Sequence, residues 1–138
     1  MYSNVLVIPM REDLTKLGIN ELRTADQVDE VFSNQEGSTL LVINSVCGCA
    51  AGNARPAVKI AMSHPVLPDN LTTVFAGQDQ EATAQARSYI EGYPPSSPSM
   101  ALFKDGQLVE MIERHQIEGR TPEQIAADLT NAFDQHCK

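Results

Sequence analysis

Short apolar runs alternate along this chain with segments whose apolar residues recur at helical spacing. Four runs predict strands, and they cover residues 39–44, 71–76, 100–103 and 108–112. The first run is uncharged and rich in β-branched residues, as is typical of a strand that is buried on both faces. Asp105-Gly106, between the last two runs, is a signal for a tight turn, so we expect those strands to form an antiparallel hairpin.

Two helical patterns precede the first strand. Residues 5–22 have apolar positions at mixed spacing and predict a weak helix or a docking segment. A clearer helix begins at Thr24, which forms a capping box with Gln27 and is followed by apolar residues at helical spacing. We expect this helix to end at Gly37, because glycine is a common residue just beyond a helix.

Two further helical patterns separate the first three strands. One follows the first strand, bends at Pro56 because an interior proline removes a hydrogen bond, and stops before Pro65. The other covers about residues 80–91, with Asp79 as its cap and Gly92 at its end.

The last predicted helix begins at Thr121, with Pro122 in its first turn and Gln124 completing a capping box. The elements therefore follow the order α-β-α-β-α-β-β-α. The early β-α-β unit should form parallel neighbours through a right-handed crossover, and the hairpin should add an antiparallel edge. This order predicts an α/β fold, with a central mixed four-stranded sheet and helices on both of its faces.

The composition narrows the class of protein. The chain has 138 residues and a net charge of −8, which argues against binding to nucleic acid or to an anionic membrane surface. No apolar run approaches the roughly 20 residues that span a bilayer, and the N-terminus has no convincing signal peptide. Three cysteines do not make a secreted disulfide scaffold. We therefore expect a cytoplasmic protein.

The candidate chemistry lies in Cys47-Gly48-Cys49, at the junction between the first strand and the helix that follows it. The start of a helix carries partial positive charge and unpaired N–H groups, and both favour a thiolate over a thiol. Cys47, the outer cysteine, is therefore the better candidate for a reactive thiolate.

The one-residue spacing between the cysteines favours disulfide exchange. In a regular helix, side chains two residues apart point roughly 200° apart, so at least one cysteine must leave helical geometry, and Gly48 permits that bend. A disulfide across so short a loop should be strained and therefore easily reduced. Two alternatives to disulfide exchange stay open. In one, the two cysteines form a buried apolar contact. In the other, they are two ligands of a metal site, which would need Cys137 or a histidine as a further ligand.

The predicted elements and this motif together resemble the thioredoxin fold. The resemblance rests on Cys47-Gly48-Cys49 at the head of a helix containing Pro56, on Ser97-Pro98 directly before a strand, and on the hairpin that follows. More specifically, residues 42–52, 74–79 and 95–102 resemble the bacilliredoxin family. The likeness covers nearly the whole chain, including Arg114-His115 and the ending from Phe133 to Cys137.

The resemblance implies one thioredoxin-like domain over residues 1–138, with a helical extension over 1–37 and the core over 38–138. It also implies a bacterial cytoplasmic thiol–disulfide oxidoreductase that removes bacillithiol, a low-molecular-weight thiol, from mixed disulfides with client proteins. Its partners would be S-thiolated proteins and the small thiol, with no nucleic acid, membrane, metal or cofactor. The oligomeric state is left open.

Site residues are carried over from the family onto matching positions. Cys47 would be the attacking thiolate and Cys49 the resolving cysteine. Gly48, Ser97 and Pro98 would contribute to substrate binding, and the resemblance implies a cis bond between Ser97 and Pro98.

Other functions use the same residues. A general disulfide isomerase or oxidoreductase would use the same cysteines without preference for one small thiol. A metal-binding module and a non-catalytic interaction domain are further alternatives. We expect His115 to be a solvated side chain and Cys137 to be a frayed, exposed thiol. Arg55 lies too far along the helix to be a confident partner for Cys47.

Overall fold

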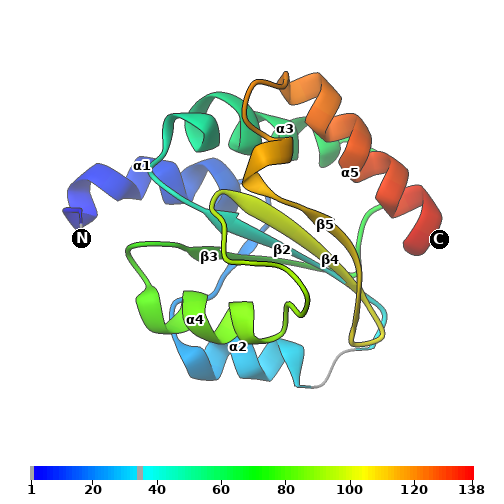
Figure 1. The fold of residues 1–138 in the computed structure, drawn as a ribbon, viewed down its shortest axis with the longest axis horizontal. Coiled ribbons are helices and arrows are strands. Elements are labelled where there is room, and N and C mark those ends of the chain that lie inside the picture. The colour runs from blue at the N-terminus through cyan, green and yellow to red at the C-terminus, as the bar shows by residue number, and fades with distance from the viewer. Residues whose placement is uncertain (1, 34–35) are drawn as a thin grey trace.

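A five-stranded mixed sheet forms the centre of the molecule in the computed structural model, which describes residues 2–33 and 36–138. The spatial order of the strands is β1-β3-β2-β4-β5 (Figure 1). β1 and β2 both run parallel to β3, whereas β4 pairs antiparallel with β2 and with β5. The strands are β1 (Asn20–Glu21), β2 (Ser38–Asn44), β3 (Asn70–Phe75), β4 (Ser99–Lys104) and β5 (Gln107–Ile112).

The prediction of four strands is wrong by one. The additional strand, β1, lies in the segment that predicts only a weak helix or a docking segment, and Asn20 pairs there with Thr72 of β3. A strand of two residues is too short to show an alternating pattern, so the sequence gives no sign of it.

Helices cover both faces of the sheet, as predicted. Figure 1 shows α1, α3 and α5 on one face and α2 and α4 on the other. A π-helical turn, η1, leads directly into α3, and a short 3₁₀ turn, η2, follows β5. The bounds are α1 (Asn4–Thr15), α2 (Ala25–Phe32), η1 (Ala50–Ala54), α3 (Arg55–Ala61), α4 (Gln80–Ser88), η2 (Arg114–Gln116) and α5 (Pro122–His136).

The N-terminal segment contributes to both the sheet and a helical layer. β1 joins the edge of the sheet, and α2 packs beside α4. The division into an extension over 1–37 and a core over 38–138 stays a prediction.

β2 is buried along its whole length. Leu40 and Val42 pack into the apolar cluster beneath α1, α3 and α5, whereas Leu41 and Ile43 pack into the cluster beneath α2 and α4. Because successive strand residues point to opposite faces, a strand between two helical layers must be apolar throughout. This explains the uncharged run in the sequence.

Two helices start where the sequence predicts them, because the Thr24 side chain accepts a hydrogen bond from the N–H of Gln27 and Thr121 does the same for Gln124. The capping box at Thr121 is complete. The one predicted at Thr24 is not, because the Gln27 side chain accepts from the N–H of Arg23 and not from that of Thr24. The end of α2 differs from the prediction, because this helix ends at Phe32 and not at Gly37. The predicted continuation to Gly37 includes residues 34–35, which lie outside the described residues.

Two predictions for α4 need correction, namely where the helix ends and how it is capped. The helix ends at Ser88 and not near residue 91. Asp79 occupies the cap position, yet its side chain makes no capping bond. Its carboxylate instead binds the buried guanidinium of Arg11 at 2.5 Å, because a charge that is removed from water needs a partner.

The helix after the cysteines changes geometry at the predicted bend. The wider turn of η1 ends at Ala54, two residues before Pro56, which lacks the N–H that would bond back into that turn. Regular α-helix therefore begins only at Arg55, and it ends at Ala61, before Pro65 as predicted. Within the described part of the chain, no helix is both long enough and apolar enough to cross a membrane.

Leu41 tests the dependence of the fold on β2. Its side chain is fully buried, so Leu41→Ala should lower the free energy of unfolding by about 2–5 kcal/mol through lost burial and a residual cavity. Urea denaturation of the reduced protein measures this. The exposed Asn131→Ala change is the control and should stay within about 0.5 kcal/mol of wild type. Equal effects of the two changes would contradict this account of the core.

Candidate active site

The cysteine motif lies in the turn where the chain leaves β2. The carbonyl oxygen of Cys47 accepts hydrogen bonds from the N–H groups of Ala50 and Ala51, at 2.9 and 3.2 Å, so Cys47 stands at the start of the helical segment. The Ser45 hydroxyl accepts from the N–H of Cys47 at 3.2 Å and fixes the turn from the other side. The predicted junction between strand and helix is confirmed.

Both thiols of the motif are partly accessible. Cys47 and Cys49 are half-buried free thiols, and Gly48 between them is exposed. Gly48 does not occupy the left-handed backbone region, and a Cβ added there would meet no atom within 4 Å. Glycine therefore leaves the surface between the two sulfurs open without meeting a backbone requirement of its own.

The surroundings of Cys47 favour its thiolate. The pKa of Cys47 lies below its ordinary value, first because the Cys49 thiol donates a hydrogen bond to the Cys47 sulfur. The N–H groups of Cys49 and Ala50 also stabilise the negative charge, and the first of them lies 3.4 Å from the Cys47 sulfur. The positive charge of Arg114 acts in the same direction, whereas partial burial opposes it.

Cys49 behaves in the opposite way. Burial raises the pKa of Cys49, and its hydrogen bond to Cys47 and the negative charge of that thiolate raise it further. The carboxylate of Glu118 adds to the effect, and Arg114 opposes it. The two cysteines therefore differ chemically, because the surroundings favour a negative charge on Cys47 and the protonated thiol on Cys49. Such a pair can exchange disulfides, with Cys47 as the stronger nucleophile.

The buried side chain of Arg55 forms hydrogen bonds to the two residues at which the cysteine turn begins. Arg55 donates from Nη1 to the carbonyl oxygen of Ser45 at 2.9 Å and to Oδ1 of Asn44 at 3.1 Å. Its Nε binds Asp13 at 3.1 Å. None of these bonds involves Cys47, in line with the expectation that Arg55 is not a partner of that thiol. Arg55 holds the backbone from which Cys47 projects.

The Ser97–Pro98 peptide bond is cis, which confirms the expectation drawn from the resemblance. Ser99 pairs with Ile43, and this register sets Pro98 beside the end of β2, where the cysteine turn begins. Pro98 is buried, whereas Ser97 is half-buried. Among the described residues, the N–H of Ser97 has no acceptor, while its carbonyl oxygen accepts from Nη1 of Arg114 at 3.3 Å.

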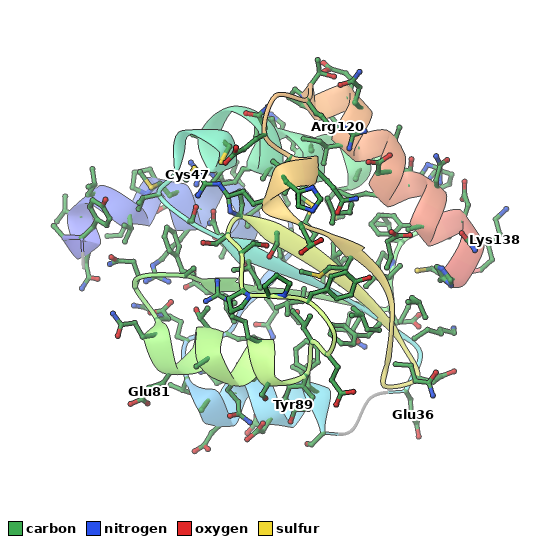
Figure 2. The ribbon with its side chains drawn as sticks, viewed as in Figure 1. Glu36, Cys47, Glu81, Tyr89, Arg120 and Lys138 are labelled. Atoms are coloured by element: carbon green, nitrogen blue, oxygen red, sulfur yellow. The ribbon has the colours of Figure 1, made fainter. Side chains whose placement is uncertain are left out.

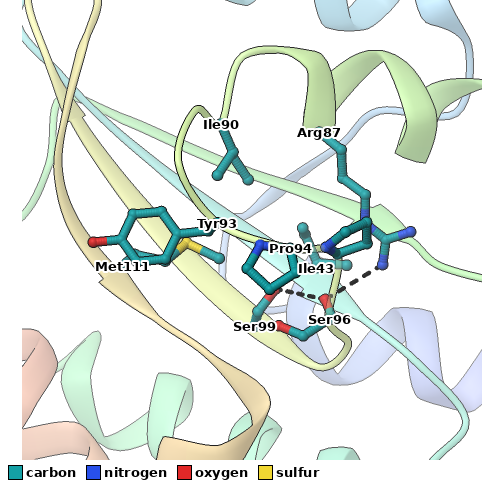
Figure 3. A pocket seen from close by; sticks show the side chains of 9 residues that line it. Ile43, Arg87, Ile90, Tyr93, Pro94, Ser96, Ser99 and Met111 are labelled. Atoms are coloured by element: carbon teal, nitrogen blue, oxygen red, sulfur yellow. Dashed lines mark hydrogen bonds between the residues drawn. The ribbon is translucent and has the colours of Figure 1, made fainter.

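A second arginine holds the same loop from the α4 side. Nη2 of Arg87 donates to the carbonyl oxygen of Ser96 at 3.3 Å (Figure 3), while Nε has no hydrogen-bond partner in the described part of the chain. Arg87 also lines a cavity of about 50 Å³ together with Ile43, Tyr93 and Met111. Its volume suits a few water molecules, so this cavity is too small to bind the small thiol.

Arg114 is the site residue that reasoning from sequence does not single out. It begins η2, after β5, and reaches back both to the loop before β4 and to the electrostatic surroundings of the two thiols. Only its place within the family resemblance marks it in the sequence. Its neighbour His115 is exposed and faces Glu113 at 3.0 Å, which confirms that it is a solvated side chain.

Cys137 corrects one expectation. It is not a frayed, exposed thiol, because it is half-buried and packs against the apolar cluster beneath α1, α3 and α5. Figure 2 shows its neighbour Lys138 on the other side of the molecule from Cys47. Across residues 2–33 and 36–138, no three His, Cys, Asp or Glu side chains gather closely enough to hold a metal ion.

Comparisons with known proteins agree with this picture. A protein-family model described as Disulphide isomerase matches residues 2–137. A protein named bacilliredoxin from Koribacter versatilis is 56% identical over 99% of this chain and 94% of its own length. Another bacilliredoxin, from Staphylococcus aureus, is 53% identical over 100% of this chain and 94% of its own length.

Solved structures show the same fold at low sequence identity. A thioredoxin from Malassezia sympodialis has a TM-score of 0.60 at 16% identity, covering 87% of this chain and 91% of that protein. Thioredoxin from Fasciola hepatica has a TM-score of 0.57 at 18% identity, covering 86% and 99%. The predicted thioredoxin-like fold is confirmed.

The hydrogen bond between the thiols predicts how Cys49 variants behave. Cys49→Ala removes the side-chain donor and should raise the pKa of Cys47 towards that of a free thiol, whereas Cys49→Ser keeps a hydroxyl donor and should raise it less. The pH dependence of iodoacetamide alkylation at Cys47, followed by peptide mass spectrometry, measures both. The same Cys47 pKa in wild type and Cys49→Ala would show that the bond does not stabilise the thiolate.

Proposed function

Given that the chain belongs to the bacilliredoxin family and is a thiol–disulfide oxidoreductase, we propose that it reduces mixed disulfides between protein cysteines and bacillithiol. In this proposal Cys47 is the attacking thiolate. The observation that carries it is the contrast between the two thiols, since the pKa of Cys47 is lowered while that of Cys49 is raised. A thiolate and not a thiol attacks a disulfide, so Cys47 is the better suited of the two cysteines to the first step.

The first step transfers the small thiol to the protein. The Cys47 thiolate attacks the bacillithiol sulfur of the mixed disulfide, a new S–S bond forms, and the old one breaks. The client sulfur leaves as a thiolate and takes a proton from solvent. The client cysteine is reduced, and Cys47 is left in a mixed disulfide, so electrons balance without a cofactor.

The second step frees Cys47 by one of two balanced routes. Once Cys47 is in a disulfide, its negative charge is gone, and with it two of the causes that raise the pKa of Cys49. Burial still raises that pKa, but Cys49 now ionises more easily, attacks the Cys47 sulfur and releases bacillithiol. A thiol pair must then reduce the Cys47–Cys49 disulfide. Alternatively, a second bacillithiol attacks the mixed disulfide and leaves as its symmetric disulfide.

Three neighbouring residues are proposed to bind the substrate. Gly48 leaves the approach to the sulfurs open, because it is exposed and carries no side chain. The N–H of Ser97, which has no acceptor among the described residues, is available to a backbone carbonyl of the client. Pro98 shapes the loop that presents this N–H.

The partners follow from the same chemistry. S-thiolated client proteins and bacillithiol are the proposed substrates, and no cofactor, metal, nucleic acid or membrane enters the mechanism. The net charge of −8 would repel nucleic acid and anionic lipid. The proposed location is the cytoplasm, where thiols are kept reduced.

Disulfide isomerase activity is the second candidate. It is favoured by the family model described as Disulphide isomerase, which matches residues 2–137. An isomerase would use the same Cys47 thiolate on disulfides within or between proteins, without preference for a small thiol. The assay below distinguishes the two functions.

One client protein in two mixed disulfides, one with bacillithiol and one with glutathione, tests the proposed function. Wild type should release bacillithiol faster than it releases glutathione. The Cys47→Ser change should abolish the release of both, whereas Cys49→Ser should keep the first turnover and slow later ones. Mass spectrometry of the client measures each. Equal rates for the two small thiols would instead support a general oxidoreductase. Faster refolding of a protein with scrambled disulfides, with no gain on either mixed disulfide, would support the isomerase.

A further inference from the structure

Arg114 contacts the loop before β4 and also acts electrostatically on the two cysteines that follow β2. Its backbone N–H donates to the Ser96 hydroxyl at 3.4 Å, and its Nη1 donates to the Ser97 carbonyl oxygen at 3.3 Å. Figure 1 shows η2, where Arg114 lies, on the same side of the sheet as α3. Its positive charge acts on both Cys47 and Cys49. Arg114 is therefore held at the mouth of the site by a loop that does not itself carry the reacting sulfurs.

The guanidinium of Arg114 keeps donors available. Its Nε pairs with the Glu118 carboxylate, and its Nη1 binds Ser97, but its Nη2 makes no hydrogen bond to any described residue. The side chains of Arg114 and Glu118 are 46% and 50% exposed. An ion pair between exposed side chains one helical turn apart is weak, because water competes for both partners. Another carboxylate can therefore replace Glu118 at little cost.

A small thiol bound to Cys47 must occupy the space beside that sulfur, within the reach of the charge on Arg114. A planar guanidinium donates two parallel hydrogen bonds to the two oxygens of a carboxylate, and it binds a neutral amide less strongly. We propose that Arg114 is a specificity-determining residue that binds a carboxylate of the low-molecular-weight thiol in place of Glu118. This inference rests on the proposed function and deepens it, because it defines the substrates as mixed disulfides with anionic thiols.

Two matched substrates test this role. One client protein with a single cysteine is joined either to 3-mercaptopropionate or to 3-mercaptopropionamide, which differ in a carboxylate against an amide. The quantity measured is the ratio of kcat/KM for the two disulfides. Wild type should favour the carboxylate by about three- to tenfold relative to Arg114→Gln. Any change in the pKa of Cys47 acts on both substrates alike, and their intrinsic reactivities are constant between variants, so both cancel when the ratios are compared.

Two further variants sharpen the test. Glu118→Gln removes the competing carboxylate and should raise the ratio above that of wild type, while added salt should lower it. Arg120→Gln removes the same charge from the same loop, but Arg120 pairs with Asp128 at 2.5 Å, so the ratio should not change. An equal ratio in wild type and Arg114→Gln, with turnover intact, would overturn the inference alone. If wild type turned over neither disulfide but still released bacillithiol from the same client, the inference would fail alone, and if it released no small thiol from any of these disulfides, the proposed function would fail as well.

Discussion

The site depends on one constraint, which is that β2 is buried on both faces and can meet solvent only where it ends. Two apolar clusters hold the strand, one on each side, so the chain emerges at a fixed point beside the start of η1. Cys47 stands at that point, and the pairing of β2 with β4 sets Pro98 next to it. Both parts of the proposed active site are thus positioned by one strand.

Electrostatics then separate two cysteines that are only one residue apart. The S–H and N–H of Cys49 both point to the Cys47 sulfur, so Cys49 stabilises a negative charge that in turn keeps its own proton in place. The contrast lasts only while Cys47 is a thiolate, and it weakens once that sulfur enters a disulfide. When Cys47 enters a disulfide, the hydrogen bond from Cys49 and the thiolate charge are both lost, and Cys49 ionises more easily for the second step of the proposed cycle. The switch between the two steps therefore needs no cofactor.

The parts of this structure that local sequence predicts are those set by local physics. The apolar run over residues 39–44 identifies the central strand because burial demands it, and Thr121 identifies the start of α5 because its hydroxyl caps its own helix. Asp79 is also predicted to cap its helix but binds Arg11, which is distant along the chain. Arg114 is missed for the same reason, since its contact with the loop before β4 exists only after the sheet has formed. Side chains that act across the fold need the structure.

The central claim is that Cys47, and not Cys49, takes up the small thiol. The most direct test is to mix wild-type protein with one equivalent of bacillithiolated client, quench with acid and N-ethylmaleimide within milliseconds, and map the adduct by peptide mass spectrometry. The account predicts that the first bacillithiol adduct is on Cys47, with Cys49 alkylated by the maleimide, and that Cys49→Ser accumulates the same adduct. A first adduct on Cys49 or on Cys137 would contradict it.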